Sequence, residues 1–345
     1  MAWVIFALAA IGVFRGGTAI AGAGDEIARR TPLGHVWVGA LLIAGATSLP
    51  ELATDTIAVL RNAPGLATGD LFGSNMANMG VLAAVALVYR QTRVLQREAL
   101  GLALAASVAI VLTGTAALFI VVRLEHSIAG AFSFGSLAVL ATAAGAWWLF
   151  PEAREAVSEP IAGGEEEAAR REAPASAAGG AVRPRREPLG RHVLAFVAAA
   201  GVIIASGSAL VWSAEQIAEI TGLSETFVGV LGLAAVTSMP ELSASLAAVR
   251  MGALDMAVGN LYGSNALNMT VLVWLDAIYV RAPLLETADP ANAAAGLVAM
   301  LLMMFGLTSM VLRAERRRFP IDPTAVVLLG GYVVGLLLVW SVSEG

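Results

Sequence analysis

The stretch "GATSLPEL" at residues 45–52 lies in an apolar segment of membrane-helix length, yet it contains a proline and a glutamate side by side. A proline removes a helical hydrogen bond, and an ionised side chain at the centre of a bilayer costs about 3 kcal/mol. The pattern returns as "AVTSMPEL" at residues 235–242. The two stretches therefore predict two broken membrane helices, each carrying an acid that serves a function.

The rest of the chain has the composition of a membrane protein. Of its 345 residues, 58% are hydrophobic and 14% are charged, whereas soluble domains carry about a quarter charged residues. Apolar runs close to the ~20 residues that cross a bilayer recur along the chain, and about ten spans are expected. They cover residues 2–23, 35–60, 66–89, 98–122, 127–150, 193–214, 224–249, 256–279, 290–312 and 322–342. This pattern predicts an all-α polytopic membrane protein.

Composition also excludes several classes of function. The chain has no cysteine, which rules out disulfides, thiolate metal sites and a cysteine nucleophile. The net charge is −5 and the basic residues lie between the spans, so nucleic acid is not an expected partner. We expect the lipid bilayer and transported ions as partners and no cofactor, and the sequence identifies no protein partner.

An internal repeat divides the chain. Residues 25–82 align with residues 215–272 without a gap, at a constant offset of 190 positions. Between the two copies, residues 151–192 are rich in Pro, Gly, Ala and mixed charge, which is typical of a solvated linker. The repeat predicts two similar halves on either side of that linker.

The predicted halves comprise residues 1–150, with the repeated segment at about 36–83, and residues 193–345, with its copy at about 226–273. Each half holds about five spans, and an odd number inverts the second half relative to the first. The expected fold is therefore about ten transmembrane helices arranged as two inverted five-helix repeats.

The arginines predict the orientation. If the N-terminus is outside, the inner loops carry the linker arginines and the cluster "RAERRR" at 313–318, whereas the outer loops keep only Arg61, Arg123 and Arg281. The positive-inside rule then places both termini outside and the linker, residues 151–192, in the cytoplasm. The expected location is the inner membrane of the cell.

The two glutamates, Glu51 and Glu241, are expected to meet at the centre of the membrane through the pseudo-twofold symmetry of the repeats. Two like charges there require a cation or protons between them. Their neighbours at helical spacing offer only oxygen: Thr47, Ser48, Ser74 and Asn78 in the first repeat and Thr237, Ser238, Ser264 and Asn268 in the second. Ca²⁺ takes 6–8 oxygen ligands, so the pattern predicts a site for a hard cation.

A further acid lies close by. Asp55 follows Glu51 by one helical turn, and its repeat mate is Ser245. Asp55 is either a third carboxylate near the ion pathway or a residue of a wet vestibule, and the sequence leaves both readings open.

The doubled motifs resemble a known family. "GATSLPEL" with "GDLFGSNMANM" (69–79), and "AVTSMPEL" with "GNLYGSNALNM" (259–269), are similar to the paired repeats of the calcium/cation antiporter superfamily, most of all its prokaryotic Na⁺/Ca²⁺ exchanger branch. The resemblance implies a Ca²⁺ site made by the Glu51 and Glu241 side chains with the carbonyls of Thr47 and Thr237. It also implies that the first and sixth helices slide across the rest of the protein to alternate access.

The resemblance further implies flanking sites linked to Na⁺ or H⁺. The residues concerned are Ser48, Ser238, Ser74, Ser264, Asn78, Asn268 and, through their carbonyls, Ala44 and Ala234. Na⁺-coupled relatives often carry an aspartate at one of the positions of Asn78 and Asn268, and this chain has asparagine at both. That departure leaves the coupling ion open between Na⁺ and H⁺.

The expected function is secondary active antiport of Ca²⁺ against a monovalent cation by alternating access, with Na⁺ favoured over H⁺ as that cation. A H⁺/Ca²⁺ exchanger is the alternative within transport, and a channel is disfavoured because broken, repeated helices are typical of alternating access. An intramembrane enzyme using the paired glutamates is the alternative from another class. The pair is symmetric and no nucleophile accompanies it, so we expect no enzyme activity.

The linker composition generates a first prediction. Deleting residues 160–186 should leave Ca²⁺ transport intact, because the segment has little to bury and loop length changes free energy only weakly. Flux in proteoliposomes, normalised to the amount of inserted protein, measures this. A folded deletion variant without flux would assign the linker to the transport mechanism.

Overall fold

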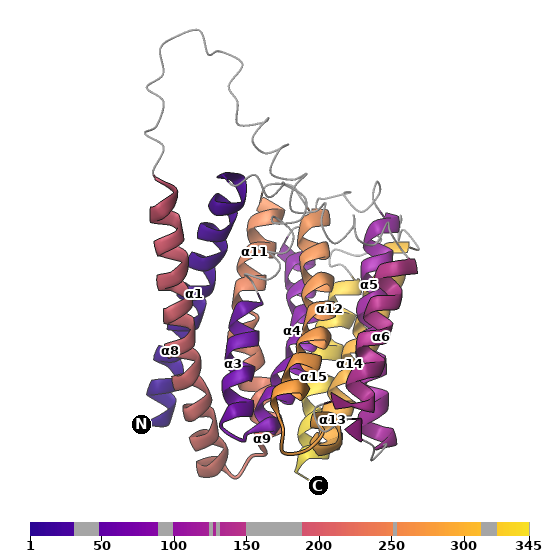
Figure 1. Ribbon diagram of the computed structural model, residues 1–345. Coiled ribbons are helices and arrows are strands. Elements are labelled where there is room, and N and C mark those ends of the chain that lie inside the picture. Colours follow the sequence, from indigo (N-terminus) through magenta and orange to yellow (C-terminus); the bar gives the residue numbers. More distant parts are fainter. Residues whose placement is uncertain are drawn as a thin grey trace, which may run out of the picture.

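The computed structural model describes residues 1–30, 48–88, 99–123, 127–128, 132–149, 188–250, 254–311 and 323–344. Within them the chain is a bundle of long helices, and the N-terminal end of α1 and the C-terminal end of α15 lie at the same end of it (Figure 1). Thr47, Ala44 and residues 151–187 of the predicted linker lie outside the described residues.

The described helices follow the expected order. In the first half they are α1 (Ala2–Arg30), α3 (Leu49–Leu60), α4 (Pro64–Val88), α5 (Ala99–Val122) and α6 (Phe134–Leu149). In the second half they are α8 (Leu189–Thr221), α9 (Glu225–Val228), the π-helix η2 (Gly229–Leu233), α10 (Ala234–Thr237), α11 (Met239–Arg250), α12 (Leu254–Ile278), α13 (Leu284–Thr287), α14 (Pro290–Val311) and α15 (Pro323–Ser343).

These helices make a multi-pass membrane protein. Among the described residues, five helices are long and apolar enough to cross a bilayer, and the bent stretch from Glu225 to Arg250 makes a sixth. The helices α4 and α12 have 25 residues each but carry the polar motifs, which lowers their hydropathy. The prediction of an all-α polytopic membrane protein is confirmed.

Several predicted boundaries were wrong, since α1 extends to Arg30 and α8 to Thr221, beyond the expected ends at 23 and 214. The span expected at 127–150 begins only at Phe134, because residues 127–128 (β1, Ser127–Ile128) pair antiparallel with residues 132–133 (β2, Phe132–Ser133). The Ser133 hydroxyl then accepts the backbone N–H of Ser136 at 3.0 Å, which caps the first turn of α6. In the second half, α8 already begins at Leu189, inside the predicted linker.

In both halves a helix begins directly after the predicted break, at equivalent residues, and in the second half the break itself lies between α10 and α11. Ser48, before α3, has φ −92° and ψ 5°, and Ser238, between α10 and α11, has φ −79° and ψ 3°. In the second half the two sides of the break are bent by 41°. Each proline, Pro50 or Pro240, lies in the first turn of the new helix, where its missing N–H has no helical partner to lose.

The centre of the bundle is a reciprocal contact between α4 and α12. Asn75 donates from its amide to the carbonyl of Asn265 at 3.3 Å, and Asn265 donates to the carbonyl of Asn75 at 3.4 Å. Asn78 donates to Oδ1 of Asn265 at 2.8 Å, and Asn268 donates to Oδ1 of Asn75 at 3.1 Å. Each bond has a mate 190 positions away, as expected where an inverted repeat meets its own copy.

A second close contact joins α4 to the helix before the break. A Cβ atom added to Gly69 would lie 2.5 Å from the carbonyl oxygen of Thr226, and one added to Gly229 would lie 2.5 Å from that of Leu66. Only glycine allows two backbones to approach so closely. The glycines of the "GDLFGSN" motif therefore serve helix packing.

The helices α1 and α8 run beside each other at one side of the bundle (Figure 1). Small residues line their contact: Gly12 of α1 faces Ser206, and Gly16 faces Ile203. A Cβ atom added to Gly17 of α1 would lie 2.8 Å from a ring carbon of Pro240 and 3.3 Å from one of Pro50. The α1/α8 pair thus covers both helix breaks.

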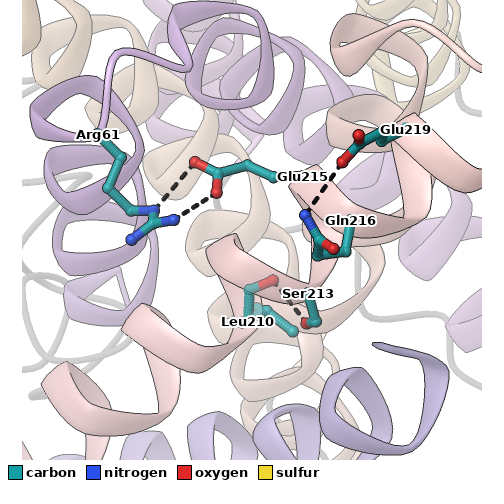
Figure 2. A network of polar contacts seen from close by, with 6 residues as sticks. All are labelled: Arg61, Leu210, Ser213, Glu215, Gln216 and Glu219. Atoms are coloured by element: carbon teal, nitrogen blue, oxygen red, sulfur yellow. Dashed lines mark hydrogen bonds and ion pairs between the residues drawn. The ribbon is translucent and has the colours of Figure 1, made fainter. Parts of the chain in front are cut away.

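An ion pair connects α8 to the end of α3. Figure 2 shows Arg61, at the end of α3, paired with Glu215 of α8 through two parallel bonds. The Nε···Oε1 distance is 3.0 Å and the Nη2···Oε2 distance is 2.5 Å. The two side chains are 40% and 21% exposed, so water screens the pair partly.

The glycine contact between α4 and η2 predicts a stability effect. Gly229→Ala should lower the free energy of unfolding by about 1–3 kcal/mol, because the added methyl group meets a backbone carbonyl that cannot rotate away. Thermal unfolding of the purified protein in detergent measures the loss. Gly201→Ala in α8 is the control, since an added Cβ there meets nothing within 4 Å. Equal stability of the two variants would contradict the packing account.

Candidate cation-binding site

The structure brings the two predicted glutamates together. Glu51 lies in the first turn of α3 and Glu241 in the first turn of α11, directly after the two breaks. Their side chains are 1% and 0% exposed, and their charges interact with each other. The packing of α3 and α11 around α4 and α12 therefore places two carboxyl groups in one buried region.

The hydroxyl groups around the glutamates differ between the two repeats. Ser264 donates to Oε1 of Glu241 at 3.3 Å, and Ser48 from the other repeat lies beside the same carboxyl group. The repeat mate of Ser264 is Ser74, which makes another bond: its hydroxyl is 3.3 Å from Oδ1 of Asp70. The symmetry of the sequence motif is thus broken in the arrangement of side chains.

Asp70 is the residue that breaks the symmetry. Its Oδ1 accepts the hydroxyl of Thr237 at 2.9 Å as well as that of Ser74, and these two hydroxyls are 3.3 Å apart. Thr237, predicted to contribute its carbonyl, therefore also brings its side chain to the site. Sequence reasoning did not assign a role to Asp70. The available signal was its repeat mate, Asn260, which is neutral at the equivalent position.

Several buried oxygens in this region have no hydrogen-bond partner, and six of them form three pairs related by the repeat. The pairs are Ser48 Oγ with Ser238 Oγ, Glu51 Oε2 with Glu241 Oε2, and Asn78 Oδ1 with Asn268 Oδ1. Buried polar atoms are nearly always paired with protein, water or an ion. Three symmetric pairs of unpaired oxygens therefore indicate a ligand that both repeats hold.

The chemistry of these atoms restricts the ligand. They are carboxylate, hydroxyl and amide oxygens, the donor set of hard cations such as Ca²⁺ and Na⁺. In the described part of the chain, no three His, Cys, Asp or Glu side chains gather closely enough to hold a metal by themselves. The neutral oxygens of serine and asparagine are therefore needed to complete the coordination of an ion.

The remaining predicted residues have varied positions. The carbonyl of Ala234 accepts the N–H of Ser238 at 3.1 Å, which leaves it one lone pair for an ion. Asp55 is 0% exposed and thus lines no open vestibule in this structure. Thr47 and Ala44 lie outside the described residues.

Comparison with known proteins extends the resemblance over the whole chain. The Inner membrane protein YrbG of Escherichia coli (strain K12) is 28% identical over 312 residues, which cover 89% of this chain and 86% of that protein. The putative antiporter CaxA of Alkalimonas amylolytica is 30% identical over 135 residues, and the human sodium/potassium/calcium exchanger 2 is 45% identical over 69 residues. The last two matches span 41% and 10% of those proteins.

Solved structures share the fold. The structure of native YfkE has a TM-score of 0.66 at 17% identity, covering 98% of this chain and 92% of that one. A structure of the sodium-calcium exchanger NCX_Mj has a TM-score of 0.54 at 20% identity, covering 97% of this chain and 98% of that one. The family model described as "Sodium/calcium exchanger protein" matches residues 1–154 and 191–341. With its doubled motifs, inverted repeat and paired glutamates, this chain belongs to the sodium/calcium exchanger protein family.

Proposed function

We propose that the protein is a secondary active antiporter that exchanges Ca²⁺ for a monovalent cation, Na⁺, by alternating access. The three symmetric pairs of unpaired buried oxygens are the observation that carries the proposal. The serine and glutamate oxygens lie at the helix breaks and the asparagine oxygens lie within α4 and α12, where the sequence motifs predict ion ligands. Membership of an exchanger family supports transport over the alternative of an intramembrane enzyme.

Ca²⁺ is the substrate that fits the central pair. Glu51 and Glu241 together carry two negative charges, which one Ca²⁺ neutralises. Neutral ligands for Ca²⁺ and for the exchanged cation come from hydroxyl, amide and carbonyl oxygens. The hydroxyl and amide oxygens belong to Ser48, Ser238, Ser74, Ser264, Asn78 and Asn268, and the carbonyls to Thr47, Thr237, Ala44 and Ala234. Without any cation the two carboxylates would repel each other in a medium of low dielectric constant, so binding is strongly favoured.

Alternating access is proposed to come from sliding of the α1/α8 pair. This pair covers both breaks, with Gly17 in contact with the rings of Pro50 and Pro240. Toward the rest of the bundle the pair presents glycines, Gly17 of α1 against the two prolines and Gly207 of α8 against Thr54, and such small residues favour sliding without large changes in packing. Sliding would expose the glutamates first to one side of the membrane and then to the other.

The orientation is proposed from the arginines. Both termini lie at one end of the bundle (Figure 1), and the loops at that end carry few arginines. We place this end outside and the linker, residues 151–192, in the cytoplasm. Similarity to the Inner membrane protein YrbG supports the inner membrane as the location. An inward Na⁺ gradient would then drive Ca²⁺ out of the cell.

The central prediction concerns the charge of the two glutamates. Glu51→Gln and Glu241→Gln should each reduce ⁴⁵Ca²⁺ flux in proteoliposomes to the level of protein-free liposomes, because glutamine keeps the shape and removes the charge. Glu219→Gln at the end of α8 is the matched control, since Glu219 is exposed and bonds only Gln216 in Figure 2. Folding is checked by size-exclusion chromatography. Near-normal flux in either buried variant would reject the two-glutamate site.

The ion pair between α3 and α8 predicts a change in the balance of states. If α8 slides past α3, the pair of Arg61 and Glu215 breaks once in each cycle. A partly exposed pair stabilises one state by up to about 1 kcal/mol, so Arg61→Gln should shift the equilibrium by up to about fivefold. The measurement is the apparent Ca²⁺ affinity on each side of oriented vesicles.

The charge-swapped double variant, Arg61→Glu with Glu215→Arg, is the matched test of that pair. It should restore the wild-type ratio of the two affinities. Failure of the swap to restore a ratio that Arg61→Gln had changed would show that the pair does not act as a link between the two states.

A further inference from the structure

The two repeats differ at one pair of facing positions. In the second repeat, Ser245 of α11 faces Asn260 of α12, and the amide of Asn260 donates to the hydroxyl of Ser245 at 3.4 Å. In the first repeat the equivalent positions on α3 and α4 are Asp55 and Asp70. These two side chains also lie within hydrogen-bonding range of each other. The same backbone arrangement thus holds a neutral, satisfied pair in one half and two acids in the other.

The acid pair has no donor to satisfy it. Asp55 and Asp70 are both 0% exposed. No described residue donates a hydrogen bond to either oxygen of Asp55 or to Oδ2 of Asp70. Two carboxylates can only accept, so neither satisfies the other when both are ionised. Three carboxylate oxygens that lack a protein donor, fully buried and on facing helices, therefore need either a shared proton or a bound cation between them.

The pair is connected to the central site. The remaining oxygen of Asp70, Oδ1, accepts the hydroxyls of Thr237 at 2.9 Å and Ser74 at 3.3 Å. Asp55 lies one turn along α3 from Glu51, and its charge interacts with that glutamate. A ligand at the acid pair would therefore feel, and change, the occupancy of the glutamate site through both charge and shared hydrogen bonds.

We propose that Asp55 and Asp70 form a further binding site for one monovalent metal cation of the size of Na⁺, present in the first repeat only. The ligands are Oδ1 and Oδ2 of Asp55 and Oδ2 of Asp70. Three carboxylate oxygens suit a hard cation, and a site with two carboxylates next to a Ca²⁺-occupied pair disfavours a second divalent ion by electrostatic repulsion. This inference rests on the proposed exchange of Ca²⁺ for a monovalent cation.

The proposal has a consequence for charge movement. Two monovalent cations at the central glutamates balance one Ca²⁺, which would make exchange electroneutral. A third monovalent cation at Asp55 and Asp70 adds one positive charge to one direction of the cycle. Exchange by the wild-type protein should therefore respond to membrane potential, and the response should depend on the acid pair.

The test variant copies the second repeat into the first. Asp55→Ser with Asp70→Asn installs the neutral pair that the protein already accommodates at Ser245 and Asn260. Wild type and variant are reconstituted in proteoliposomes, and Na⁺-driven ⁴⁵Ca²⁺ flux is measured at several potentials clamped with K⁺ and valinomycin. Each flux is divided by the flux of the same protein at zero potential. Asp289→Asn, at the start of α14, is the control with an acid removed elsewhere.

We expect the flux of the wild type and of Asp289→Asn to respond to the membrane potential, and the flux of the double variant not to respond. A response that persists in the double variant, or a wild-type flux that ignores the potential, would overturn the proposal. A flux that follows the pH gradient and does not depend on Na⁺ would overturn the assignment to a metal cation in favour of a proton.

Two additional measurements keep the test independent of the proposed function and of folding. Ca²⁺/Ca²⁺ exchange without any Na⁺ tests the central glutamates alone, and its absence in the wild type would reject the proposed function. The loss of thermal stabilisation by Na⁺ in the double variant relative to the wild type, measured in detergent at fixed pH and without Ca²⁺, tests the acid pair, because Na⁺ at the central glutamates stabilises both proteins. If the double variant does not fold, Asp55→Asn replaces it, because the new amide can donate to Asp70. Na⁺ stabilisation equal to that of the wild type in either variant would reject the acid pair as a site.

Discussion

The constraint on which this structure depends is the burial of carboxylate oxygens that no protein donor satisfies. Each ionised acid in a membrane interior is costly, and two facing acids are more so. Glu51 and Glu241 are both buried and retain one unpaired oxygen each. These oxygens are presented to a cation by three features of the fold. They are the breaks at Ser48 and Ser238, the facing repeats and the surrounding hydroxyl groups.

The fixed part of the scaffold is the contact between α4 and α12. The reciprocal bonds of Asn75 and Asn265 hold the two helices at the pseudo-twofold axis, and the amides of Asn78 and Asn268 complete the arrangement. Because these amide nitrogens are engaged across the axis, the Oδ1 atoms of Asn78 and Asn268 remain available. The movable part that we propose is the α1/α8 pair, which touches the same breaks from the other side. The site thus lies between the hydrogen-bonded contact of α4 with α12 and the α1/α8 pair that we propose to move.

The sequence predicted the helices, the internal repeat and the paired glutamates, because those depend on composition and on spacing along one chain. It did not predict the β1–β2 pairing before α6, since residues 127–133 are as apolar and small as a true span and Ser133 acts as a cap only in the folded protein. Asp70 was missed for another reason. It shares its motif with Ser74, but its contact with Thr237 crosses from one repeat to the other, and such contacts follow from tertiary packing alone.

Comparing the repeats position by position would have found more than the motifs did. Asp55 and Asp70 each have a neutral repeat mate, Ser245 and Asn260, and the two acids lie next to each other in space. A motif shared by both halves identifies ligands that both repeats supply. A difference between the halves, such as the acid pair here, identifies a site that only one repeat supplies.

The most direct measurement of the central claim is anomalous diffraction from crystals of the protein grown in Na⁺-free medium with Ca²⁺. The account predicts an anomalous peak between the carboxyl groups of Glu51 and Glu241, within coordination distance of both, that disappears when Na⁺ replaces Ca²⁺ in the soak. A Ca²⁺ peak bound elsewhere, with the two glutamates in contact with no ion, would contradict it.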